Sequence, residues 1–64
     1  MNINEAKADA MRARQAYSRM ESRAWTAREL GEMLGEDFYK GMRAAKTSVD
    51  LAEQRVRRIL EKMP

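Results

Sequence analysis

Six basic side chains gather in two short stretches of the sequence, and they are the groups best suited to hold phosphate. Five are arginines, whose planar fork makes two parallel hydrogen bonds to a phosphate and also stacks on bases. In a chain folded back on itself, residues 12–14 lie opposite residues 57–59. A basic end that binds RNA or DNA is therefore one hypothesis, with Arg12, Arg14, Arg55, Arg57, Arg58 and Lys62 as its contacts.

The same charges also fit a solvated helix surface. Lys and Arg number 13 against 10 Asp and Glu, so the net charge is only +3, which does not demand a nucleic-acid partner. Glu53 and Arg57 are placed as an attractive pair one helical turn apart. Nucleic-acid binding is therefore the alternative to a protein-binding function. Acidic residues gather in the middle of the chain, at Glu29, Glu32, Glu36 and Asp37.

Catalytic chemistry has few candidate residues in this sequence. With no His and no Cys, the chain lacks the commonest general base, the strongest nucleophile and the usual zinc ligands. Its Ser and Thr hydroxyls have no evident base beside them, and there is no glycine-rich phosphate loop. We therefore expect no enzyme activity, no cofactor, no metal site and no small-molecule substrate.

The sequence also bears on location. No stretch reaches the roughly 20 apolar residues of a membrane span, and the N-terminus has no secretory signal. The absence of cysteine fits a reducing compartment. We expect a cytoplasmic protein that does not enter membranes.

The elements that must position these residues are helical. Asn2 followed by Glu5 is a capping pattern that begins a helix. From there, apolar residues recur at alternating steps of three and four, a heptad pattern, at Ile3, Ala6, Ala10, Ala13, Tyr17, Met20, Ala24 and Ala27. Gly35 is suited to end this helix in the left-handed conformation.

A second helix carries the same spacing. Asp37 is its expected cap, and its apolar residues are Phe38, Met42, Ala45, Val49, Ala52, Val56, Ile59 and Met63. The predicted fold is an all-α antiparallel helical hairpin in a single domain spanning residues 1–64, with a helix over about 3–34, a turn over 35–37 and a helix over 38–62. An alternative is a three-helix domain with a break near Thr26, because Thr26 and Glu29 form another capping pattern.

A lone hairpin of this kind should be unstable, because alanine-rich contacts bury too little apolar area to offset the ordering of some sixty residues. Further apolar residues lie beside the heptad positions and need a cover. The simplest cover is a second copy, which gives a homodimer in the form of a four-helix bundle. The residues predicted to bind protein in this way are Met11, Trp25, Leu30, Met33, Tyr39, Leu51 and Leu60.

This arrangement resembles the Rop family of plasmid-encoded helical hairpins, which dimerise into bundles with alanine-rich layers. The resemblance lies in architecture, through Ala6, Ala10, Ala13, Ala45 and Ala52, and not in a sequence motif. Members of that family bind RNA through polar residues of one helical face, which have no residue-by-residue match here. Its function is therefore not carried over.

The function predicted from the sequence is that of a small regulatory or adaptor protein, without catalysis, acting through protein–protein binding. Short helical proteins of this style are frequent among phage and plasmid products. Trp25, the single tryptophan, is a natural anchor for a partner.

Overall fold

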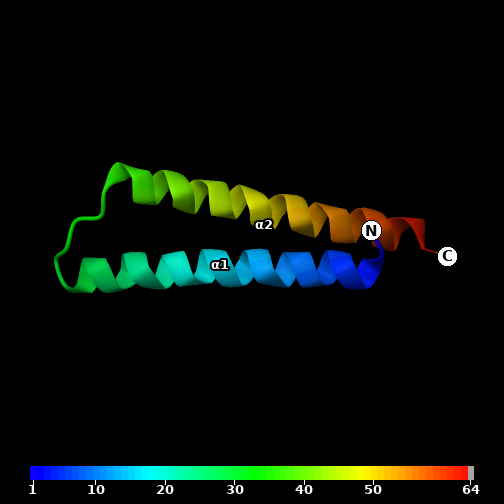
Figure 1. Cartoon of the computed structure of the whole chain (residues 1–64), viewed down its shortest axis with the longest axis horizontal. Coiled ribbons are helices and arrows are strands. Elements are labelled where there is room, and N and C mark those ends of the chain that lie inside the picture. The colour runs from blue at the N-terminus through cyan, green and yellow to red at the C-terminus, as the bar shows by residue number, and fades with distance from the viewer. Residues whose placement is uncertain (64) are drawn as a thin grey trace.

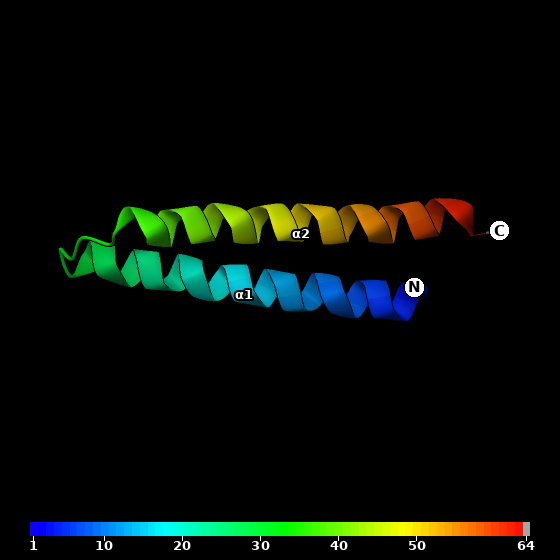
Figure 2. The same ribbon diagram turned by 45° about the horizontal axis from the view of Figure 1, so that its top comes forward.

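The computed structural model describes residues 1–63 and has two helices, α1 (Ile3–Glu29) and α2 (Glu36–Lys62), each of 27 residues. They run antiparallel and lie side by side along their length (Figures 1 and 2). The start of α1 and the end of α2 therefore lie at the end of the molecule opposite the loop, which we call the open end. The predicted all-α helical hairpin is confirmed.

The start of α1 follows the capping pattern in the sequence. The Asn2 Oδ1 atom accepts a hydrogen bond from the backbone N–H of Glu5 at 2.9 Å. This satisfies one of the N–H groups that the first turn of a helix leaves without an intrahelical partner. The prediction of a helix that begins at residue 3 is confirmed.

The predicted alternative of a break near Thr26 is wrong. Thr26 lies inside α1, and its carbonyl accepts the backbone N–H of Leu30 at 3.0 Å. Ala27, one residue further on, is buried against α2, so burial holds this part of the helix in line. The capping pattern of Thr26 and Glu29 is overridden by packing, and the chain forms two helices and not three.

The first helix ends five residues before the predicted residue 34, at Glu29, and the predicted turn over 35–37 is a loop over residues 30–35. Gly31 adopts a left-handed φ of 72°. Its N–H bonds to the carbonyl of Arg28 at 3.3 Å, and the N–H of Glu32 bonds to that of Ala27 at 2.8 Å. These two bonds form a Schellman motif. The left-handed glycine that follows α1 and stops it is therefore Gly31 and not the predicted Gly35.

The second helix begins at Glu36, two residues before the predicted residue 38. Its N-cap is Gly35, which supplies no side-chain hydrogen bond, so the predicted cap at Asp37 is wrong. Asp37 lies instead in the first turn of α2 beside Glu36. Carboxylates at this position are stabilised by the positive end of the helix dipole.

The buried core between the helices is very small. Its members are four alanines and one valine: Ala6, Ala10, Ala27, Val49 and Ala52. The other heptad residues of both helices are half-buried, apart from Met63 at the open end, which is 51% exposed. No large side chain is fully buried among residues 1–63, so the heptad pattern is confirmed but encloses little apolar volume.

The hairpin is long and thin, with extents of 52 × 16 × 14 Å and a radius of gyration of 14.9 Å. A compact chain of this length has a radius of gyration of about 11 Å. The solvent-accessible surface is 5190 Å², whereas a folded monomer of this mass exposes about 4,200 Å². The excess, about 1,000 Å² by this scaling, is surface that neither helix covers.

Candidate docking surface

One side of the hairpin carries a shallow groove between α1 and α2. Three hollows of about 520, 380 and 540 Å³ follow one another from the loop to the open end. On each helix, the residues that line the hollows lie on or beside the heptad positions and always toward the same side. The three hollows therefore lie on one side of the hairpin. We call this side the groove face. Its lining includes Met11, Arg14, Tyr17, Trp25, Arg28, Tyr39, Met42, Lys46, Val56 and Arg57.

The loop end of the groove face is aromatic and sulfur-rich. Trp25 from α1 and Tyr39 from α2 line the same hollow together with Met33 and Met42. Trp25 is 63% exposed and Met33 is 97% exposed. An apolar cluster this open to water, in a concave setting, is typical of a surface that binds another protein.

Contacts with neighbouring residues orient the two tyrosines of the groove face. Tyr39 packs edge-on against the half-buried Phe38, with ring centroids 5.6 Å apart and planes at 87°. The ammonium of Lys46 lies 6.0 Å from the centroid of the Tyr17 ring, within the range of a cation–π contact. Packing against these neighbours limits the freedom of both rings, which lowers the entropy lost when a partner binds.

All seven residues predicted to bind protein are exposed. Four of them line the hollows of the groove face: Met11, Trp25, Met33 and Tyr39. Leu60 belongs to the same side, because it follows Glu53 by seven residues and Val56 by four. Leu51 and Leu30 do not line these hollows, and Leu51 faces the other side of the hairpin.

The groove face also carries ion pairs. Arg14 Nε donates to Glu53 Oε1 at 3.0 Å and so links α1 to α2. Lys46 Nζ donates to Asp50 Oδ1 at 3.1 Å within α2. This hydrogen bond and the charge of Asp50 raise the pKa of Lys46 above its ordinary value of 10.5. The Arg14–Glu53 pair therefore lines the open-end hollow, and Lys46 lines the middle hollow beside Tyr17 and Met42.

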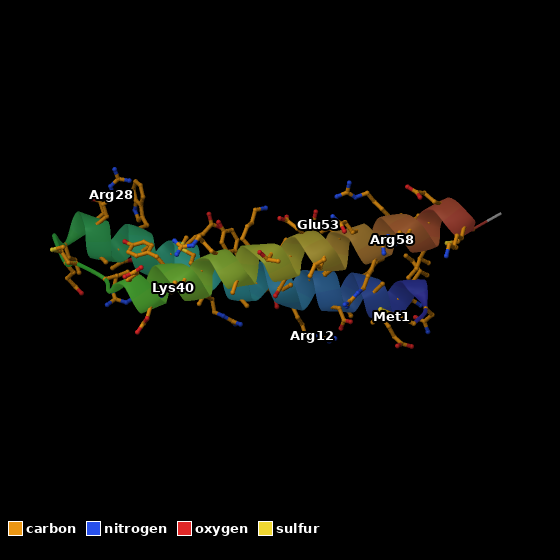
Figure 3. The ribbon with its side chains drawn as sticks, turned by 90° about the horizontal axis from the view of Figure 1, so that it is seen from above. Met1, Arg12, Arg28, Lys40, Glu53 and Arg58 are labelled. Carbon is orange, nitrogen blue, oxygen red and sulfur yellow. The ribbon has the colours of Figure 1, made fainter. Side chains whose placement is uncertain are left out.

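The six basic residues of the nucleic-acid hypothesis do not share one surface. Arg14 and Arg57 line the groove face, whereas Arg12, Arg55, Arg58 and Lys62 lie on the opposite side of their helices. Figure 3 shows Arg28 and Glu53 pointing to one side of the hairpin and Arg12 to the other.

The side opposite the groove face gathers more arginines than the sequence predicted. Arg19 and Arg23 follow Arg12 at steps of seven and four, so α1 presents them on the same side. We call this side the arginine face, and its basic residues are Arg12, Arg19, Arg23, Arg55, Arg58 and Lys62. The heptad spacing could have identified Arg19 and Arg23, because it assigns a side to every residue of a helix.

Several of these arginines already have partners. Arg12 forms an ion pair with Asp9, and Arg23 Nη2 lies 3.3 Å from Glu32 Oε2 in the loop. Within residues 1–63, Arg55, Arg58 and Lys62 have no carboxylate at ion-pair distance. Among the described residues Arg19, in the middle of α1, has none either, so three of the four uncompensated charges of the arginine face lie at the open end of α2.

The described residues contain no grouping of three or more acidic, His or Cys side chains that could hold a metal ion. Neither helix in this part of the chain is long and apolar enough to cross a membrane.

No protein-family model, no curated protein and no solved structure matches the chain. What the protein binds must therefore be inferred from its own surface.

Proposed function

We propose that this chain is a small regulatory or adaptor protein without catalytic activity that acts through protein–protein binding, with the groove face as its docking surface. The observation that carries the proposal is the pairing of Trp25 and Tyr39 in one open hollow at the loop end. Large amphipathic aromatics in concave, apolar settings supply most of the binding energy in protein interfaces. A plasmid or phage origin and a cytoplasmic setting fit such a role.

The shape of the groove face favours a helical partner. It is a long hollowed strip between two parallel ridges of side chains, and helices pack by placing one ridge into such a groove. Apolar contacts are available at both ends, from Trp25 and Tyr39 near the loop and from Met11 and Val56 near the open end. An amphipathic helix with anchors along one side matches this pattern.

Site-specific photocrosslinking in living cells tests the proposal. A benzophenone amino acid at Tyr39 replaces one aromatic ring by another on the groove face. The matched control is Gln54, which is exposed and points away from α1 by helix geometry. We expect an adduct from position 39 and none from position 54, and the mass of the adduct identifies the occupant of the groove face as a second copy or as a different protein. Equal adducts from both positions, or no adduct from position 39, would contradict docking at the groove face.

Nucleic-acid binding is a second candidate, favoured by the six basic residues of the arginine face. Phosphate contacts release counterions when they form. The logarithm of the binding constant therefore falls linearly with the logarithm of the salt concentration, with a slope of about −0.9 per phosphate contact. We expect replacement of both Arg55 and Arg58 by glutamate to abolish binding of a labelled RNA or DNA duplex. The control Lys40→Glu changes a charge outside both faces. Binding that is weak and independent of salt in the unmodified protein would remove this candidate.

A further inference from the structure

The uncovered surface of the hairpin is close to what one subunit of a dimer hides. The chain exposes 5190 Å², about 1,000 Å² more than the monomer scaling allows. A standard protein–protein interface buries about 800 Å² on each partner. The groove face, with hollows along the hairpin, is the surface on which this area is available.

Four apolar residues of the groove face are arranged symmetrically about its middle. On α1, Met11 and Trp25 each lie seven residues from Ser18. On α2, Tyr39 lies ten residues before Val49 and Leu60 lies ten residues after Asp50. The contact of Arg14 with Glu53 places Ser18 level with Val49, because each is four residues further along its helix toward the loop. The two helices therefore share one midpoint.

We propose that a second copy of this chain covers the groove face head to tail, with a two-fold axis passing beside Ser18. The inference rests on the docking role proposed above and names the occupant. In this arrangement Met11 packs against Trp25 of the second copy, and Tyr39 against Leu60. Apolar ends meet apolar ends, and four helices enclose the half-buried residues Tyr17, Met42 and Val56.

Charge favours the head-to-tail orientation. The loop end, residues 28–40, holds four carboxylates and two basic side chains, whereas the open end, residues 1–9 and 55–63, holds five basic side chains and three carboxylates. Of the five basic side chains, Lys7 and Arg57 line the groove face, and Arg55, Arg58 and Lys62 lie on the arginine face. Turning the second copy end for end brings each acidic loop beside a basic open end, which stabilises this orientation. A turn-to-turn dimer would place the two acidic loops together.

Within the groove face the same two-fold axis brings opposite charges level. Arg14 comes opposite Glu21 of the second copy, and Lys46 opposite Glu53. Two like-charged pairs also come level, Lys7 with Arg28 and Arg43 with Arg57. Their long side chains extend into water, which separates and screens the charges.

Single-cysteine crosslinking tests the arrangement, because the chain has no native cysteine. Ser18→Cys places a thiol at the expected two-fold axis. Ser48→Cys is the matched control, since Ser48 is an exposed serine near the middle of α2 on the opposite side. We expect sedimentation to give twice the 7.4 kDa of one chain. A short bismaleimide should then crosslink the Ser18→Cys protein and not the Ser48→Cys protein.

The other outcomes each overturn the proposal in a distinct way. A single species of 7.4 kDa at millimolar concentration would leave the groove face free for a different protein and would remove only the second copy. A dimer that crosslinks through Ser48→Cys alone would place the interface on the arginine face and would overturn the docking role as well. A dimer that crosslinks at neither position would overturn the head-to-tail arrangement, as expected of a turn-to-turn dimer in which Ser18 lies opposite α2 of the second copy.

Discussion

Arg14 and Glu53 are 39 residues apart in the chain, yet their side chains meet in a hydrogen bond of 3.0 Å across the hairpin. Among residues 1–63, this is the one ion pair that joins α1 to α2. It sets Arg14 level with Glu53, about one helical turn from the predicted position opposite residues 57–59. The shift follows from the loop over residues 30–35, because an earlier end of α1 moves the point where the chain reverses.

The strength of this contact can be measured with a double-mutant cycle of Arg14→Ala and Glu53→Ala. The two side chains are 64% and 35% exposed, so the expected coupling is only about 0.2–1 kcal/mol. It should decrease as sodium chloride is added, because salt screens exposed pairs. Urea denaturation at low and high salt gives the coupling. A cycle at the neighbouring Gln15 and Gln54 should show none, and equal coupling in both cycles would argue against a specific ion pair.

The left-handed Gly31 that ends α1 should not tolerate a side chain. A Cβ there meets no neighbouring atom within 4 Å, so the effect of Gly31→Ala comes from its φ of 72° alone. The expected loss in the free energy of unfolding is about 1–2 kcal/mol. Gly41→Ala is the contrasting variant, because Gly41 is helical and its new Cβ would lie 3.4 Å from Met20 Cε. It should stabilise the helix by about 0.5–1 kcal/mol. Thermal denaturation that shifts both variants in the same direction would contradict this assignment.

The close approach of the helices depends on small side chains at their contact. Ala10 is 4% exposed, so Ala10→Leu must push the helices apart or strain its rotamer, which typically costs about 1–3 kcal/mol. Ala16→Leu adds the same atoms at an exposed position and should change stability by less than about 0.5 kcal/mol. Urea denaturation compares the two. Equal losses would indicate that α1 contacts α2 through a different side.

The heptad pattern was sufficient to predict the two helices and which side of each is buried. Ala6, Ala10, Val49 and Ala52 lie where the pattern placed them, because a helical period assigns every residue a direction. The exposure of Met63 was not predicted, since the pattern has no information on how far α2 extends beyond its partner. In Figure 1, the C-terminal end of α2 reaches past the start of α1.

The loop and the surfaces were less predictable for a physical reason. Gly31 and Gly35 both follow a leucine in an apolar stretch, and local sequence does not decide which of them takes the left-handed conformation. The groove face depends on the register between helices, which the Arg14–Glu53 contact reveals and no single-helix pattern contains. Counting charges along the chain grouped Arg14 and Arg57 with Arg12. In the structure Arg14 and Arg57 line the groove face, whereas Arg12 lies on the arginine face.

The pH dependence of stability offers a last test, at the ion pair of Lys46 and Asp50. The hydrogen bond from Lys46 to Asp50 and the charge of that carboxylate raise the pKa of Lys46 in the folded chain above 10.5. The folded state therefore holds this proton more tightly than the unfolded state. The stabilisation is fully present below the unfolded pKa and is lost as the pH rises through the folded pKa.

The urea concentration at the unfolding midpoint should consequently fall less steeply with rising pH in Lys46→Met than in the unmodified protein, at pH values above the ordinary lysine pKa of about 10.4. Lys40→Met removes an exposed lysine on the outer side of α2 and should keep the decline of the unmodified protein. The informative quantity is the difference between the two variants. Parallel curves for both would show that the proton on Lys46 does not stabilise the fold.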